Sequence, residues 1–443
     1  MPFSIDAIRR CIVKTTFIAA GDAFITRRIP DSGYSGFEKI RRLISSADFR
    51  FVNLEMTFHR QEGYPAASSG GTWAMADPVL LKDMLRFGFN VFNTANNHSG
   101  DFGQEGVLAT ARHLRALDMP FAGTGATLQE AARPVYVETP ESRVALIGLT
   151  SSFDPAARAG GQSGDMLGRP GLNPLRHQTV HHVNEEHFRM AEELAKTTLV
   201  NWPIEQKIEC GYAAPFPPGR MPFGKMNFVL DEREFTETLP HSEDLARTVE
   251  GVREARRQAD IVVVSLHAHE MKGKKTNEAA QFVETFSRAC IDAGASIVFG
   301  HGPHELRGIE RYRGGLIFYS IGNFLFETET TALQPYDAYV DMKLPVDTQT
   351  GRYMDVRSAE GTRGFPVMPQ IWEAVLPYVT IEDGRITEAA LHPIDLGMKC
   401  SRGTRGVPRL SKNEATLRYL ADLSAPYGTR IDVRDGVGYV ELD

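Results

Sequence analysis

Short apolar runs recur along the chain, and each ends in a polar or ionisable side chain. The first run, Thr15 to Ala20, leads directly into Gly21-Asp22. A continuous apolar run of this length, bounded by a turn signal, predicts a strand that is buried on both faces. Four more runs have the same form: Phe49–Leu54, Val91–Ala95, Ile261–Leu266 and Ser296–Phe299. We therefore predict five buried strands that deliver polar groups at their carboxyl ends.

Segments with apolar residues at helical spacing separate these strands. They are Ser35–Ser45, Pro78–Phe87, Gly106–Leu117, Ser242–Gln258 and Thr276–Ala293. Alternation of strands and helices predicts a layered α/β domain. Ligands of such domains collect beyond the carboxyl ends of the strands, so the polar strand ends should converge on one crevice.

One long segment, residues 150–241, interrupts this alternation and is rich in Gly, Pro, Arg and His. We predict that it is an insertion that folds over the site as a cap. The main domain then spans residues 12–400, and residues 401–443 form a C-terminal extension that packs on the core. The turn Asp383-Gly384 predicts two strands at the edge of a sheet.

Composition narrows the class of protein. The chain has 443 residues, of which 42% are hydrophobic and 24% charged, as in ordinary globular proteins. Its net charge of -7 and pI near 6.0 provide no overall attraction to polyphosphates or anionic lipids, so we expect no nucleic-acid and no membrane partner. No secretory signal or long apolar stretch occurs, which predicts a cytoplasmic location. The oligomeric state has no signal in the sequence.

The four cysteines lie far apart and show no paired spacing. This pattern argues against a zinc knuckle and against a disulfide framework. We expect all four to be reduced thiols: Cys11, Cys210, Cys290 and Cys400.

Two carboxylates, Asp22 and Glu55, each follow a buried strand. Either residue alone is more commonly a turn or a helix cap. A carboxylate buried at a strand end must however pair with a cation or reach water, because unpaired burial is costly. Together the two residues are candidate ligands for a hard cation.

The run from Asn93 to Gly106 is a more specific signal. Asn97 offers a neutral oxygen to a metal, His98 can act as a general acid or an oxyanion donor, and Asp101 can orient its ring. A tight polar turn would need fewer functional groups, so we favour the functional interpretation.

Two histidine pairs follow two other strands. Strand alternation points His267 and His269 to the same side, and a loop shaped by glycine and proline carries His301 and His304. Two such pairs at neighbouring strand ends are hard to explain by packing. The catalytic candidates are therefore His98, Asp101, which can orient the His98 ring, and His269.

The order of the motifs GD, NLE, ANNHxxDxGxxG, a His-bearing strand end, GHxPH and YSxGNFxF resembles the CapA family, named for poly-gamma-glutamate capsule synthesis. That family is similar to the calcineurin-like metallophosphoesterases. The resemblance covers roughly Phe17 to Phe326. It implies an α/β fold of the metallo-dependent phosphatase type, a four-layer αββα sandwich, with a centre for two divalent ions.

Carried over position by position, the resemblance implies a set of metal ligands and a proton donor, His98. The implied ligands are Asp22, Glu55, Asn97, His267, His301 and His304. The chain departs from the pattern at Phe24, where the superfamily has a histidine ligand, and at Gly302, where relatives often have a second histidine. It also has His267-Ala-His-Glu where relatives often read HWGxE.

These features predict a metal-dependent hydrolase that uses divalent Mn, Zn or Fe. The expected substrate is a small or peptide-like anion with a phosphoester or a gamma-glutamyl amide bond. Arg169 and Arg220 of the insertion are candidates for binding its carboxylate or phosphate. Asn323, where an apolar strand breaks, is an equally good candidate for a substrate contact or for a bulge.

Two other functions stay open. One is a metal-independent peptide epimerase or isomerase, with Asp22 and either His98 or His304 as bases. The other is a non-catalytic protein of poly-gamma-glutamate biosynthesis or assembly. Analogy at the level of the fold does not choose among these reactions.

Overall fold

All five predicted strands are present, and they belong to two large sheets. The computed structural model describes residues 13–442, so Cys11 lies outside the described part. The ten strands of the first sheet are β1 (Lys14–Phe24), β2 (Phe49–Leu54), β5 (Val91–Asn93), β6 (Phe121–Ala122), β21 (Asn323–Phe326), β22 (Glu373–Glu382), β23 (Arg385–Asp395), β24 (Arg409–Leu410), β25 (Ile431–Arg434) and β26 (Val437–Val440).

The main path of the first sheet runs β25-β26-β23-β22-β1-β2-β5-β6, with β21 beside β1 and β24 beside β23. The second sheet has six strands in the order β19-β20-β18-β15-β9-β8. Their bounds are β8 (Val135–Glu138), β9 (Arg143–Thr150), β15 (Ile261–His267), β18 (Ile297–His301), β19 (Leu306–Tyr312) and β20 (Gly315–Ile321). In each sheet the strands that lead to the predicted site run parallel to each other.

The central strands are apolar on both faces because each sheet is covered by the other sheet on one face and by helices on the other. On β1, Phe17 and Ala19 belong to an apolar cluster that both sheets share, and Ile18 and Ala20 belong to the cluster under the helices. On β15, which begins at Ile261, the odd-numbered apolar residues belong to the cluster that both sheets share. The even-numbered residues belong to the cluster under the helices of the second sheet. These strands therefore need continuous apolar runs. A half-exposed strand would instead alternate apolar and polar residues.

Helices cover the outer face of each sheet. The first sheet is packed by α1 (Phe37–Ser45) and α2 (Leu81–Phe87), and the second by α7 (Ser242–Gln258) and α8 (Gln281–Asp292). The order of layers is helix, sheet, sheet, helix. The predicted α/β class is confirmed.

One predicted helix begins later than expected. Residues Lys275–Ala279 form a strand, β17, paired with β16 (Met271–Lys272), so α8 starts only at Gln281. The helix predicted over Gly106–Leu117 is present as α3 (Gly103–Arg115). The shorter elements are β3 (Thr57–Phe58), β4 (Met75–Ala76), β7 (Thr124–Gly125), β10 (Gly171–Leu172), α4 (Leu128–Ala132), α9 (Tyr336–Asp341) and α10 (Thr350–Arg357). Within residues 13–442, no helix combines the length and the apolar character needed to cross a bilayer.

The strands on either side of the Asp383-Gly384 turn form the predicted hairpin, but they are not at an edge. β22 lies between β1 and β23, and β23 is itself covered by β26. The edge prediction was wrong because the covering strand comes from the last part of the chain. There α11 (Glu414–Ser424) also packs Leu417 and Leu420 into the cluster between the sheets.

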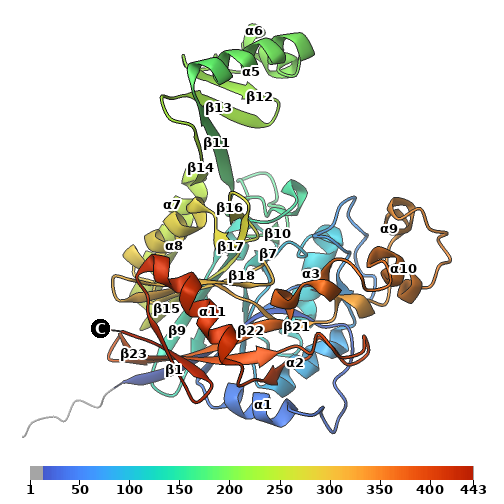
Figure 1. Ribbon diagram of the computed structural model, residues 1–443, viewed down its shortest axis with the longest axis vertical. Coiled ribbons are helices and arrows are strands. Elements are labelled where there is room, and N and C mark those ends of the chain that lie inside the picture. The colour runs from blue at the N-terminus through green and yellow to red at the C-terminus, as the bar shows by residue number, and fades with distance from the viewer. Residues whose placement is uncertain (1–12, 443) are drawn as a thin grey trace, which may run out of the picture.

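The segment 150–241 divides into two parts. Residues 151–175 stay against the two-sheet body, whereas residues 176–241 form an arm that extends away from it (Figure 1). The arm has its own four-stranded sheet and two helices: β11 (His177–Val183), β12 (Arg220–Phe223), β13 (Met226–Leu230), β14 (Phe235–Pro240), α5 (Glu185–Thr198) and α6 (Trp202–Glu209).

A buried carboxylate, Asp244, joins the base of the arm to the body. It accepts hydrogen bonds from the backbone nitrogen and the guanidinium of Arg176, at 2.8–2.9 Å, and from Arg247 at 2.7 Å. Burial opposes ionisation of Asp244, but the two arginines outweigh it, so its pKa lies below the usual value.

We expect Asp244→Asn to lower the free energy of unfolding by about 2 kcal/mol at pH 7, because charged hydrogen bonds contribute more than neutral ones. A lowered carboxyl pKa stabilises the fold above the unfolded-state value, near 4, and this contribution is lost as the pH falls further. Urea titrations should therefore show a difference between the two proteins that is constant from pH 7 to 5 and shrinks below about pH 4. A difference that grows on acidification would contradict this role.

Candidate metal centre

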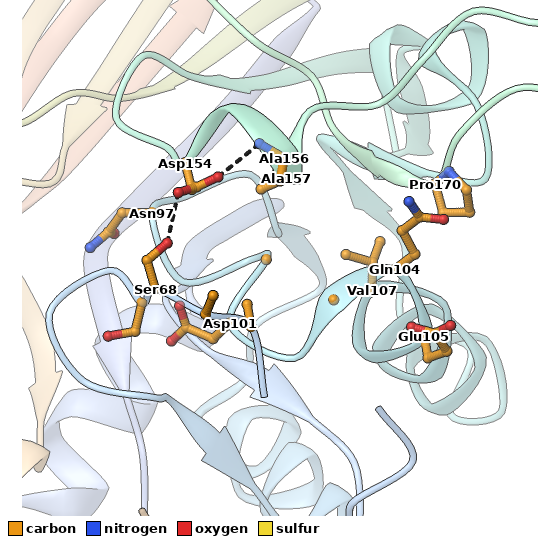
Figure 2. Close-up of a pocket in the computed structure, with 15 residues that line it drawn as sticks. Ser68, Asn97, Asp101, Gln104, Glu105, Val107, Asp154, Ala156, Ala157 and Pro170 are labelled. Atoms are coloured by element: carbon orange, nitrogen blue, oxygen red, sulfur yellow. Dashed lines mark hydrogen bonds between the residues drawn. The ribbon is translucent and has the colours of Figure 1, made fainter. Parts of the chain in front are cut away.

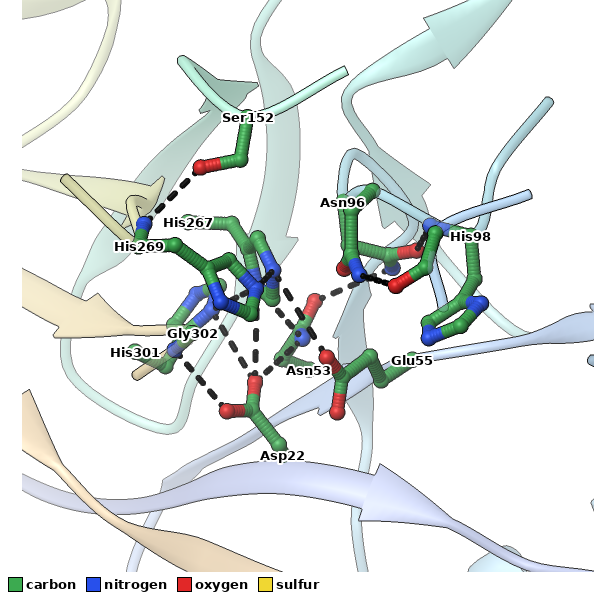
Figure 3. A network of polar contacts seen from close by, with 12 residues as sticks. Asp22, Asn53, Glu55, Asn96, His98, Ser152, His267, His269, His301 and Gly302 are labelled. Carbon is green, nitrogen blue, oxygen red and sulfur yellow. Dashed lines mark hydrogen bonds and ion pairs between the residues drawn. The ribbon is translucent and has the colours of Figure 1, made fainter. Parts of the chain in front are cut away.

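Four of the predicted ligands, Asp22, Glu55, His267 and His301, converge where strands of both sheets end (Figure 3). Asp22 lies near the end of β1, and Glu55 directly follows its parallel neighbour β2. His267 and His301 end β15 and β18 and face each other in the register of these parallel strands. The first sheet therefore supplies carboxylates to the centre and the second sheet supplies imidazoles.

The two carboxylates and the histidines are within a few ångströms of each other. Asp22 Oδ1 is 3.5 Å from His267 Nδ1 and 3.3 Å from His301 Nδ1. Its other oxygen is 3.7 Å from His304 Nδ1. Glu55 Oε1 is 3.6 Å from His267 Nε2 and 3.7 Å from His304 Nε2. His267 and His304 thus lie between the two acids.

Three overlapping sets of side chains bring one ligand atom each within 4.8 Å of one another. The sets are Asp22, His267 and His301; Glu55, His267 and His269; and Asp22, Glu55 and His304. Carboxylate oxygens and imidazole nitrogens suit Zn, Mn and Fe. His269, which we predicted as catalytic, lies inside one of these sets.

Glu55 is the clearest indication that a cation belongs here. Its side chain is fully buried, and within residues 13–442 neither carboxylate oxygen has a hydrogen-bond partner. Burial, and then the charges of Asp22 and Asp101, raise its pKa well above the usual value. A buried carboxylate without a partner is costly, and a divalent ion between these groups would supply the missing charge. The residues present therefore fit a metal.

Asp22 and His267 are held in the protonation states that ligation needs. Burial opposes ionisation of Asp22, but His267 and His301 outweigh it and hold its pKa well below the usual range. Asn53 Nδ2 and the Gly302 backbone nitrogen also donate to Asp22, at 2.7 and 2.8 Å. Burial lowers the pKa of His267 to about 4, so its ring is neutral at pH 7 and can ligate.

His98 and Asp101 form the predicted pair. His98 Nδ1 is 2.7 Å from Asp101 Oδ2, and the backbone nitrogens of Gly70 and Ala74 donate to the same carboxylate at 3.0 and 2.8 Å. Figure 3 shows His98 on the Glu55 side of the cluster. Phe24, which stands where the superfamily has a histidine, packs its ring edge-on against His98 at 5.6 Å. Phe24 therefore buttresses the candidate proton donor.

The backbone conformation explains why position 302, the second departure from the family pattern, is a glycine. Its φ is +120°, and a Cβ there would lie 2.9 Å from the backbone nitrogen of Ala268. Its N–H donates to Asp22. A side chain at this position would be strained and would disturb that bond.

Asn97 takes a different position from the other predicted ligands. Its amide nitrogen donates to Gly70 O at 2.8 Å, and its oxygen is buried without a hydrogen-bond partner. Figure 2 shows it among the residues that line a pocket, with Asp101 and Asp154. The volume of this pocket is about 440 Å³. Within the described residues, no hydrogen bond joins Asn97 to the carboxylates and histidines above. Its neighbour Asn96 instead bonds to Leu54 O and reaches Asn53.

The structure separates the three predicted substrate-binding residues. Asn323 belongs to the centre, because its Oδ1 lies 2.9 Å from His304 Nδ1. Arg169 is on a loop and donates to Arg158 O at 2.9 Å. Arg220 begins β12 in the arm, which extends away from the body (Figure 1). Neither arginine contacts the cluster of carboxylates and histidines in the described part of the chain.

Several polar residues that hold the ligands were not singled out from the sequence. Ser265 lies 2.8 Å from His301 Nε2, and Ser152 accepts the backbone N–H of His269 at 2.8 Å. Asn53 stands in the NLE motif, and Ser265 precedes His267 by one strand period, so both had a signal. Ser152 had none, because it comes from a loop that only the fold brings near.

Arg307 is a buried residue that holds the backbone next to the candidate metal centre. Its side chain is 1% exposed, and its guanidinium donates to the carbonyls of Thr276, Ala268 and His269 at 3.0–3.2 Å. No ion pair to Arg307 occurs among the described residues, and burial lowers its pKa to about 10. The guanidinium therefore fixes the loop that carries His269.

We expect Arg307→Met to lower the free energy of unfolding by about 2–3 kcal/mol, because buried carbonyls lose their donors. It should also weaken metal binding, since the His269 loop is released. Urea unfolding and metal titration measure the two effects. Arg307→Lys, which keeps a donor, should recover part of both; equal stability of the Met variant and the wild type would contradict this role.

Comparison with known proteins points to one family. Residues 16–328 match the family described as "Bacterial capsule synthesis protein PGA_cap". The chain is similar to the protein y4sH of Sinorhizobium fredii (strain NBRC 101917 / NGR234), at 33% identity over 96% of this chain and 93% of the relative. It is also similar to "Capsule biosynthesis protein CapA" of Bacillus anthracis (23% identity; 78% and 70% covered) and to "PGA biosynthesis protein CapA" of Bacillus subtilis (strain 168) (24% identity; 68% and 60% covered).

Proposed function

Since the chain belongs to the bacterial capsule synthesis family PGA_cap, we propose that it is a metal-dependent hydrolase with a sandwich of the metallo-dependent phosphatase type. Its substrate is a peptide-like anion, cleaved at an amide or phosphoester bond. The observation that carries the proposal is Glu55, a fully buried carboxylate with no hydrogen-bond partner in the described chain. It lies next to Asp22 and to histidines that include His267 and His304, whose pKa values burial lowers. Relatives named for capsule and PGA biosynthesis support the substrate class.

The centre would hold metal through Asp22, Glu55, His267, His301 and His304. Bound divalent ions supply a water of lowered pKa and neutralise charge on the attacked group. Asn53 and Gly302 orient Asp22 by donating to its two oxygens.

His98 supports the departure of the leaving group. Its Nδ1 is bonded to Asp101, so Nε2 is the nitrogen that can pass a proton to the leaving oxygen or nitrogen. Asp101 is itself fixed by two backbone nitrogens, which hold the pair in one geometry. Hydrolysis then needs one water: its oxygen joins the carbon or phosphorus, and one proton goes to the leaving group.

The pocket beside this pair offers room for the leaving group. Its volume is about 440 Å³, and within the described chain no Lys, Arg or His lines it. Asp101, Glu105 and Asp154 do line it, and Asp154 is bonded to Ser68 Oγ at 2.7 Å (Figure 2). We assign an uncharged or amine-bearing part of the substrate to this pocket, because an anion would be repelled there.

We expect His98→Gln to lower kcat by about 10²–10³-fold, the usual contribution of a positioned proton donor. Metal content should stay unchanged, because His98 is outside the three ligand sets. Steady-state kinetics and metal analysis of the same preparation check both statements. Loss of metal in this variant would reassign His98 as a ligand.

Metal analysis tests the proposal itself. Protein purified without chelator should contain at least one Mn, Zn or Fe ion per chain, and EDTA dialysis should abolish hydrolysis of bis(p-nitrophenyl) phosphate or of gamma-glutamyl-p-nitroanilide. Restoring the metal should restore the rate. Absence of metal together with a rate that EDTA leaves unaltered would overturn the proposal.

Two further measurements separate the alternatives. Incorporation of solvent deuterium at a substrate Cα without hydrolysis would identify an epimerase. Full biological function of a His98→Ala variant in a capsule assay would identify a non-catalytic assembly protein.

A further inference from the structure

A second cavity lies at the end of the body opposite the metal centre. It is a groove of about 770 Å³, bordered by the last turns of α7 and α8, the β19–β20 turn and the β22–β23 turn. It adjoins the amino ends of β15 and β18, through Asp260 and Ser296, whereas His267 and His301 stand at their carboxyl ends. Seven residues of β15 at 3.3 Å each separate the two places by roughly 20 Å.

Four arginines line this groove: Arg256, Arg311, Arg313 and Arg385. The acidic residue among its described lining residues is Asp260, which accepts the backbone N–H of Arg143 at 2.8 Å. The lining is thus positively charged, although the whole chain has a net charge of -7. A local charge opposite to the overall charge marks a surface that attracts anions.

Two of these guanidinium groups have unused donors. Arg385 is exposed and has no side-chain hydrogen bond or ion pair within residues 13–442. Arg256 makes one bond, from Nη1 to Ala259 O at 3.0 Å. Arg313 is paired with Asp292 at 2.7 Å. Because a guanidinium presents five N–H groups in a planar fork, Arg385 and Arg256 can each bind a carboxylate through two bonds.

We propose that this arginine groove, defined by Arg256, Arg311, Arg313 and Arg385, binds an acidic peptide segment with several carboxylates. Its arginines come from α7, from β19 and the turn after it, and from the start of β23. An elongated ligand with spaced charges therefore matches them better than one compact anion does. None of the lining residues is aromatic, so the groove has no platform on which nucleic-acid bases could stack. The site is independent of the hydrolase proposal.

Binding of a glutamate hexapeptide to the full chain tests this site. Fluorescence anisotropy with labelled hexaglutamate should show saturable binding that weakens as salt is added, and hexaglutamine should not bind. The Arg256→Ala/Arg385→Ala double variant should bind at least 10-fold more weakly. Arg41→Ala removes an exposed arginine of α1 that is bonded to Glu38, and it should leave binding unchanged.

Further probes and variants make the outcome decisive. Hydrolysis of a small substrate should be unchanged in the double variant, and hexaglutamate should still bind Asp22→Asn protein, which separates this site from the metal centre. If the double variant loses its thermal transition, Arg385→Gln alone serves, because that side chain is exposed. No hexaglutamate binding, equal loss in Arg41→Ala, or equally tight binding of oligodeoxythymidylate or of inorganic phosphate would overturn the proposal.

Discussion

Asp22→Asn is expected to lower the hydrolytic rate by about 10³-fold or more, the largest functional effect of any single change in this chain. Asp22 belongs to two of the three ligand sets and contacts three histidines. A metal Lewis acid contributes several kcal/mol to the transition state, and each 1.36 kcal/mol changes the rate tenfold. Asparagine also presents an N–H₂ group where Asn53 and Gly302 donate, so one of these bonds is lost.

Metal content, kinetics and a thermal melt of the same preparation measure this effect. Asp31→Asn is the matched control, because Asp31 is exposed and lies outside the ligand sets. A folded Asp22→Asn protein that keeps both its metal and its rate would refute the role of Asp22 as a ligand. A folded protein that loses metal but keeps its rate would refute the metal-dependent mechanism.

Gly21→Ala is expected to lower the free energy of unfolding by more than about 3 kcal/mol, beyond the usual cost of an added methyl in a packed core. A Cβ at Gly21 would lie 1.8 Å from the carbonyl oxygen of Gly322, and that oxygen already accepts the N–H of Asp22 at 3.2 Å. Both atoms belong to backbone, so β1 or the turn at Gly322 must shift. The shift also moves Asp22.

Urea unfolding of Gly21→Ala, with its yield of soluble protein, measures this cost. Gly351→Ala is the control, because a Cβ there meets nothing within 4 Å, and its stability should change by less than about 0.5 kcal/mol. A Gly21→Ala protein as stable as the control would show that the strand and the turn yield easily.

The strand ends were predictable because their signal is local. A strand buried on both faces requires a continuous apolar run, and a polar residue at its end is visible in the same few letters, as at Asp22, His267 and His301. Neighbouring parallel strands then bring such residues together at one edge of the sheet. These residues needed no knowledge of the partner strand.

The roles of Asn97, Arg169 and Arg220 stay predictions, because their surroundings depend on more than this local signal. The motif around Asn97 contains two asparagines, and which of them turns toward Asn53 is set by the contact with Leu54 and Gly70. The two arginines were chosen for their charge, within a segment where the alternation of strands and helices is interrupted. Its path depends on β11 pairing with β13 and β14, and these pairings lie many residues apart.

The sequence by itself determined the class of fold, the strands that end in candidate ligands and the kinds of atom that gather there. These properties follow from short apolar runs and from the residues that directly succeed them. Only the tertiary structure decided that His267 and His304 lie between Asp22 and Glu55, that Glu55 has no hydrogen-bond partner within the described residues, and that the arm leaves the body. The physical reason is that contacts between sheets depend on packing across the whole chain, which no local stretch of residues specifies.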